Sequence, residues 1–207
     1  MQNVAQSWLV WHVSRSPVAI GIIAFFDTLP RLLVGAVGGA IADRFDRRRV
    51  LMITQSLAMV QAVIYWLLVQ FELIELWHIA VLAFFLGMVN TINQTARQSL
   101  VNSLVPKEEL LNAIGLQSSV FNFSKILGPS LGGVIIAWIS IAGCFLVNAL
   151  SFIYLIFNLY LMELPPWEKR IDQLNIWADE KEGFHYLLSN RRMLYIVGLS
   201  YVTATFV

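Results

Sequence analysis

Charged residues are scarce in this sequence. They make up 13% of its 207 residues, where a soluble domain usually has roughly a quarter. Hydrophobic residues make up 58%. Because a soluble protein of this length needs far more polar surface, the composition excludes an ordinary soluble domain and predicts that most of the chain lies in a lipid bilayer.

Cysteine is nearly absent too. The single one, Cys144, lies in an apolar run, which excludes a disulfide framework and a cysteine-based metal site. No His, Asp and Glu residues have the spacing of metal ligands, and no phosphate-binding loop is visible. The chain also lacks a long basic tail, which argues against a nucleic-acid partner. We therefore expect no cofactor, and no enzyme, since no nucleophile with a base stands out.

Long apolar segments are what the chain does have. Residues 50–71 contain no Asp, Glu, Lys or Arg, and neither do residues 126–162. The second run would be about 55 Å long as one helix, too long for one span, and residues 140–143 are its natural break. The predicted spans are 1–13, 18–42, 50–71, 76–96, 110–139, 142–162 and a last one from 193 onward.

The first and last of these spans are shorter than a membrane crossing. Residues 1–13 reach only about 20 Å as a helix, and the last apolar run stops part way through a span. We interpret both as incomplete helices of a longer protein. Pro165 and Pro166 end the sixth span, so we expect three parts: a transmembrane bundle (1–164), a cytoplasmic linker between bundles (165–190), and the start of a seventh helix (191–207).

Basic residues concentrate in alternate turns. The turns after the second, fourth and sixth spans carry Arg44, Arg47, Arg48, Arg49, Arg97, Lys107, Lys169, Arg170, Lys181, Arg191 and Arg192. The opposite turns carry Arg15 alone as a basic residue. The positive-inside rule therefore predicts a multi-pass membrane protein with these turns and the linker in the cytoplasm.

The basic turn between the second and third spans carries more than charge. Its arginines alone would serve as a topology signal. However, Gly38 and Gly39 precede it and permit close helix approach. Asp43 adds nothing to the positive charge, so it needs another role, such as pairing with an arginine or facing the N-terminus of a helix.

This turn resembles the loop signature of the major facilitator superfamily. The pattern Gly-x-x-x-Asp-Arg-x-x-Arg-Arg-Arg supplies the signature residues Gly39, Asp43, Arg44, Arg47 and Arg48. Asp46 stands where the family usually has glycine. The resulting form is similar to the branch of enterobactin exporters, secretion effectors and macrolide-type efflux proteins. In that family, the loop contacts a helix of the second bundle and stabilises one of the two transport states.

A second pattern lies on the fifth predicted span. The run Gly128-Pro129-x-x-Gly132-Gly133 resembles the antiporter motif of the superfamily's exporters. Its alternative reading is a kinked helix that packs closely, since neighbours repair the lost backbone bond. Ser124 replaces the usual middle glycine of that motif, so close packing is preserved while the bend differs.

The resemblance implies the N-terminal half of a twelve-helix transporter. The expected fold is an all-α six-helix bundle of two inverted three-helix repeats, and the partner is a second bundle of the same protein. The implied function is proton-coupled export of a small organic molecule, a siderophore or a hydrophobic drug, by alternating access. The alternatives are a lysophospholipid transporter of the same fold, and a non-transporting scaffold or inert fragment.

Several ionisable and polar residues lie within predicted spans. Arg31 follows Asp27 by one helical turn, and Lys125 lies near the middle of the fifth span. Such ions face a bundle interior. Asp27 could take up a proton while Arg31 and Lys125 bind an anionic group; alternatively, a permanent ion pair holds spans two and five together.

The inner end of the fourth span adds a polar face. Asn93 and Arg97 belong to it, with Asn90 and Gln94 beside them. These residues could line the cavity. They could equally form hydrogen bonds between helices.

Overall fold

The computed structural model describes residues 1–106 and 108–162, without the side chains of 32–44, 102 and 103. The chain divides into two units, Met1–Lys169 and Arg170–Val207, and only the first contains described residues. The predicted linker (165–190) and seventh helix (191–207) lie outside them. The three-part division of the chain therefore stays a prediction.

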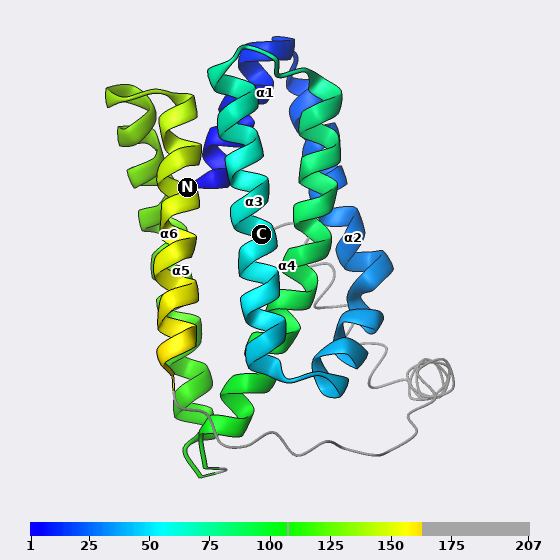
Figure 1. Ribbon diagram of the computed structural model, residues 1–207, viewed down its shortest axis with the longest axis vertical. Coiled ribbons are helices and arrows are strands. Elements are labelled where there is room, and N and C mark those ends of the chain that lie inside the picture. Colours follow the sequence, from blue (N-terminus) through cyan, green and yellow to red (C-terminus); the bar gives the residue numbers. More distant parts are fainter. Residues whose placement is uncertain (107, 163–207) are drawn as a thin grey trace. The chain divides into compact units, whose positions relative to one another are not determined.

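The described residues form α-helices and no strands (Figure 1). The helices are α1 (Gln2–Ser14), α2 (Pro17–Arg44), α3 (Arg47–Gln70), α4 (Leu76–Leu104), α5 (Leu110–Trp138) and α6 (Ile141–Leu161). Within the described residues, four helical stretches are long and apolar enough to cross a membrane: α3, residues Leu76–Val101 of α4, α5 and α6. The expectation of an all-α chain with membrane-length helices is confirmed.

Polar side chains cap the beginnings of α3 and α6. Asp46 precedes α3 and accepts a hydrogen bond from the backbone N–H of Arg48 at 3.0 Å. Ser140 precedes α6 and accepts one from the N–H of Gly143 at 2.9 Å. Both satisfy backbone donors that the first turn of a helix leaves free. The predicted break at 140–143 thus coincides with a capped helix start.

α4 extends furthest beyond its predicted span. α4 continues to Leu104, beyond the predicted end at residue 96. The reason is that hydropathy reports where the apolar segment ends, whereas backbone hydrogen bonding continues as a helix through Arg97 and the polar residues after it.

The core holds α2 against α4, and α3 against both α4 and α6. Gly87 of α4 lies where α2 crosses it: an added Cβ would overlap the carbonyl oxygen of Asp27 and come within 3.0 Å of Pro30 Cγ. Tyr65 of α3 stacks on Phe145 of α6 with ring centroids 4.6 Å apart. Cys144, beside Phe145, is fully buried in the same cluster.

A chain of buried amide side chains links four helices. Asn148 of α6 donates to Gln2 of α1 at 2.7 Å, and Gln2 donates to Gln61 of α3 at 2.7 Å. Gln61 in turn donates to the carbonyl oxygen of Leu82 in α4 at 3.3 Å. Because unpaired polar groups are costly in an apolar interior, this chain fixes α1 in a defined register against the other three helices.

Candidate functional site

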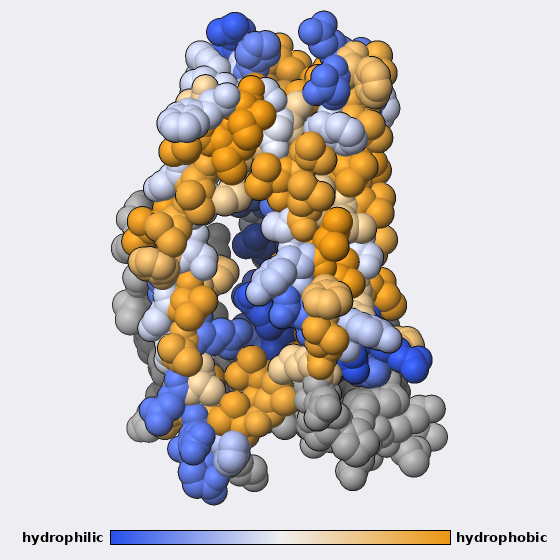
Figure 2. All heavy atoms as spheres, turned by 60° about the vertical axis from the view of Figure 1, so that its left-hand side comes forward, coloured by the Kyte–Doolittle hydropathy of each residue, from blue (hydrophilic) through white to orange (hydrophobic). Residues whose placement is uncertain are grey.

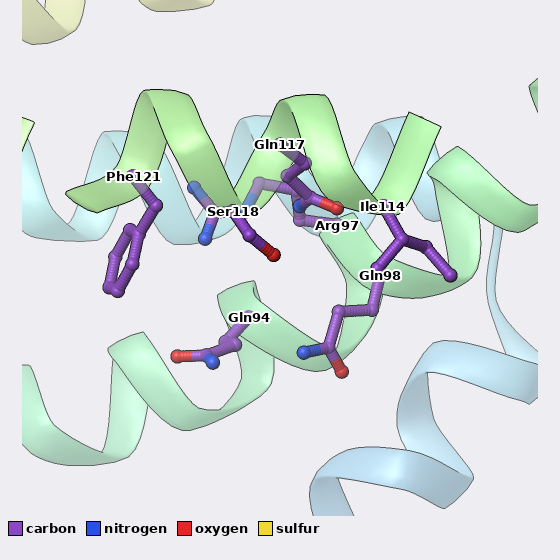
Figure 3. Close-up of a pocket in the computed structure, with 7 residues that line it drawn as sticks. All are labelled: Gln94, Arg97, Gln98, Ile114, Gln117, Ser118 and Phe121. Carbon is purple, nitrogen blue, oxygen red and sulfur yellow. The ribbon is translucent and has the colours of Figure 1, made fainter. Parts of the chain in front are cut away.

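A polar pocket lies between α4 and α5, near the end of the bundle where α4 ends and α5 begins (Figure 3). Its volume is about 340 Å³. Gln94 and Gln98 of α4 lie across the pocket from Ser118 and Phe121 of α5. The remaining lining residues are Arg97, Ile114 and Gln117.

Two cations lie beside the aromatic ring of Phe121. The guanidinium carbon of Arg97, from α4, is 5.9 Å from the ring centroid. The Nζ atom of Lys125, one turn further along α5, is 4.7 Å from it. Both distances fall within the range of cation–π attraction. Two cations from different helices therefore lie beside the ring of Phe121, and of the two Arg97 lines the pocket.

Neither cation has a carboxylate partner among the described residues. The ion pair found there joins Arg49 to Asp46 at 3.6 Å. Arg97, Lys125 and Phe121 are all exposed on the surface of this unit. Figure 2 shows one face of the molecule, where hydrophobic side chains predominate and hydrophilic ones gather at the ends and within a hollow part way along.

Asp27 lines a different, smaller pocket. This one lies between α1 and α2 and has a volume of about 160 Å³. The polar side chains of Asn3, Gln6 and Ser7 line it together with Asp27. No described cation, Arg31 included, lies within ion-pair distance of the Asp27 carboxylate. In the described structure Asp27 and Lys125 are thus not joined as a pair.

The polar face predicted at the inner end of α4 divides between two environments. Asn93 donates to the hydroxyl of Thr54 in α3 at 2.8 Å. Gln94 and Arg97 instead line the pocket against α5. One stretch of helix therefore contributes both to contact with a neighbouring helix and to the pocket.

An arginine that follows the basic turn, at the start of α3, contacts the end of α6. Arg48 donates from its guanidinium to the backbone carbonyl of Tyr160 and also lies over the Tyr160 ring, 5.8 Å from the centroid. Cations are favoured beside the carbonyls that end a helix. The Nε atoms of Arg47 and Arg48 are buried with no hydrogen-bond partner in the described part of the chain. Gly39, Asp43 and Arg44 lie on α2, where side chains are outside the description.

Two glycines of the pattern on α5 lie against the N-terminal residue. A Cβ added at Gly128 would lie 3.3 Å from the Met1 nitrogen, and one at Gly132 would lie 3.3 Å from Met1 Cα. Gly133 has open space at the same position. Pro129 lies inside α5. Small residues thus allow α1 to approach α5 closely, as in other membrane bundles.

Sequence reasoning missed five residues of the polar pocket, which are Gln98, Ile114, Gln117, Ser118 and Phe121. The signal was present: Gln117 and Ser118 are polar residues within an apolar helix. Gln117, Phe121 and Lys125 are spaced four residues apart, so they share one face of α5. In the described residues, no group of three or more His, Cys, Asp or Glu could hold a metal ion.

Comparison with known proteins gives a family match along almost the whole chain. The family described as transmembrane secretion effector matches residues 1–201. No solved structure matches the chain.

Named relatives are transporters. The MFS-type transporter YfiS of Bacillus subtilis is 31% identical over 200 residues, which covers 91% of this chain and 45% of YfiS. The multidrug efflux pump Tap of Mycolicibacterium fortuitum is 30% identical, covering 72% of this chain and 39% of Tap. The enterobactin exporter EntS of Shigella flexneri is 28% identical, covering 87% of this chain and 42% of EntS. The chain spans less than half the length of each.

Proposed function

Because the chain belongs to the transmembrane secretion effector family of major facilitator superfamily transporters, we propose that it forms half of a proton-coupled exporter. The exporter carries a small organic molecule, a siderophore or a hydrophobic drug, out of the cell by alternating access. Relatives named as an enterobactin exporter and a multidrug efflux pump support both substrate classes.

The polar face of α5 is the observation that carries this proposal. Only 6% of its most apolar stretch is buried inside the bundle, against 39% for α3. Yet the exposed residues of α5 include Ser118, Asn122 and Lys125, which lipid would not solvate. A face of this kind suits a water-filled cavity and a second bundle that closes over it.

The inverted three-helix repeats stay part of the proposal, and the helix contacts support them. If α1–α3 correspond to α4–α6, the packing of α2 on α4 corresponds to that of α5 on α1, and both pairs are in contact. In this correspondence α3 and α6 exchange places, so their mutual contact is matched by itself. Both α2 and α5 contain an internal proline, Pro30 and Pro129.

The basic turn supports a second bundle as partner. Arg48 is bonded within the unit, to Tyr160. The Nε atoms of Arg47 and Arg48 are buried but unbonded within the described residues, and buried donors normally have a partner. We assign the contact with the second bundle to this turn. The basic residues of the turn and linker favour a cytoplasmic position for both in a protein of the bacterial inner membrane.

Asp27 is the proposed proton carrier. It is the one acidic residue that lines the pocket between α1 and α2, and the amides and hydroxyl around it can bond either its charged or its protonated form. An acid within a membrane helix is costly unless it serves the transport pathway. When Asp27 takes up a proton, Arg31, one helical turn away, would lose the electrostatic attraction of a neighbouring negative charge.

Efflux from cells tests the function. The full-length gene product is expressed in bacteria that lack their main exporters, and the cells are loaded with a catecholate siderophore or a lipophilic dye. Energised cells should release one of them faster than vector controls, and a protonophore should abolish the difference. If the protein inserts normally but the cells release each compound no faster than vector controls, the result would contradict an exporter and favour the non-transporting scaffold.

A further inference from the structure

The two cations beside Phe121 come from different helices. Lys125 follows Phe121 by one turn of α5, so both side chains lie on the same helix face. Arg97 reaches the same ring from α4. Two like charges near one another repel, and the repulsion grows in a low-dielectric environment. In the described unit both side chains are exposed, so water screens this repulsion. Once a second bundle covers them, as proposed above, a negative charge beside them would be needed.

No protein carboxylate supplies that negative charge in the described residues. Neither Arg97 nor Lys125 forms an ion pair there, and no Asp or Glu lines the pocket. Of the two cations, Arg97 lines the pocket and Lys125 lies beside its lining residue Phe121. Cations within a membrane bundle usually pair with an acid or mark a substrate pathway. Since the described chain offers no acid, a bound anion is the partner that fits.

The neutral lining residues fit an oxygen-rich molecule. Gln94, Gln98 and Gln117 each provide two N–H donors and a carbonyl acceptor, and Ser118 adds a hydroxyl. Ile114 and the ring of Phe121 provide apolar area. A positively charged molecule would find only partial charges here and two full charges of its own sign, which selects against it.

We infer that this pocket binds organic anions that carry a carboxylate, with the carboxylate held by Arg97, which lines the pocket, and by Lys125, which lies beside the lining residue Phe121. The hydroxyl or carbonyl groups of the anion bond to the glutamines, and its apolar part lies against Phe121 and Ile114. The inference rests on the proposed export function and narrows its substrate to acids. The volume of about 340 Å³ lies at the lower end of ligand pockets, as expected if a second bundle completes the site.

Two dyes with the same xanthene framework test the charge preference: carboxyfluorescein, an anion, and rhodamine 123, a cation. Both are loaded into cells or proteoliposomes that contain the full-length gene product. Carboxyfluorescein should be exported, and rhodamine 123 should not. Arg97→Gln and Lys125→Gln should each lower carboxyfluorescein export by about tenfold or more, the loss expected for one charge-assisted hydrogen bond.

Conservative and distant variants separate binding from folding. Lys125→Arg keeps the charge and should keep most of the export. Arg15→Asn removes a cation from the opposite end of the bundle and should change nothing. Each variant is checked for membrane insertion and a single species on gel filtration, and carboxyfluorescein binding to the purified protein is measured by fluorescence polarisation.

The outcomes distinguish failure of the anion site from failure of the proposed export function. Export of rhodamine 123 without carboxyfluorescein overturns the anion site and leaves the exporter standing. Carboxyfluorescein export that is equal in wild type, Arg97→Gln and Lys125→Gln also overturns the site. Export of neither dye, by protein that inserts normally and binds neither, contradicts the export function and the inference together.

Discussion

Gln61 accepts a hydrogen bond from Gln2 at 2.7 Å while it lies fully buried between the helices. Its own amide then donates to the Leu82 carbonyl. A carboxamide that both accepts and donates in an apolar interior is satisfied in one orientation only, because the reverse orientation turns its N–H groups toward another donor. The pair therefore specifies how α1 sits on α3 and α4.

Gln61→Leu tests this role. The substitution leaves the Gln2 amide with an unsatisfied buried donor, so we expect the protein to lose about 1–2 kcal/mol of stability and to melt at a lower temperature in detergent. The control is Gln70→Leu, at the exposed end of the same helix. If both variants melt at the same temperature, the amide chain makes no specific contribution to the stability of the protein.

Gly87→Ala should disturb the crossing of α2 and α4. The added methyl group would overlap the Asp27 carbonyl, and the overlap forces a backbone shift that costs about 1–3 kcal/mol. Gly21→Ala is the matched control, because its Cβ would meet nothing within 4 Å. Thermal unfolding followed by tryptophan fluorescence measures both. An unaltered Gly87→Ala protein would falsify the close approach at this crossing.

Arg48→Gln should loosen the end of α6. The variant removes the guanidinium that bonds to the Tyr160 carbonyl, so the last turn of α6 opens more often. Hydrogen exchange read by mass spectrometry should speed up in the peptide that contains Tyr160. Arg49→Gln, which removes the neighbouring arginine paired with Asp46, should leave this peptide unchanged. Equal exchange in wild type and Arg48→Gln would remove the link between the turn and α6.

Asp27→Asn should uncouple export from the proton gradient. Asparagine keeps the size and hydrogen bonding of the side chain but cannot titrate. We expect substrate binding to survive and gradient-driven efflux to fall by tenfold or more, as measured in proteoliposomes with an imposed pH step. Glu72→Gln, in an exposed turn, is the acidic control. Gradient-driven efflux that persists in Asp27→Asn assigns coupling to another residue.

The helices themselves were predictable from the sequence. Charge-free runs of membrane length usually form membrane-spanning helices. Ser140, which caps α6, lies at the predicted break between the last two of these helices. The end of α4 was not predictable in this way, because a helix that leaves the apolar layer keeps its backbone bonds while its hydropathy falls.

Pairing between helices was harder to foresee. In a helix that is apolar on every side, periodicity does not mark which face meets which neighbour. Nothing local therefore indicated that Arg97 and Lys125 would meet at Phe121, or that Gln61 would meet Gln2. The amides inside apolar runs were visible, but their partners lie on other helices far away in the sequence.

The burial of Cys144 has a practical consequence. It is shielded on every side, so a water-borne maleimide dye has no route to its sulfur while the fold holds. A cysteine introduced at Gln117 would then be the one thiol that reacts within residues 1–162. A spectroscopic label at position 117 could then report on the polar pocket between α4 and α5, and Cys144 would not have to be removed first.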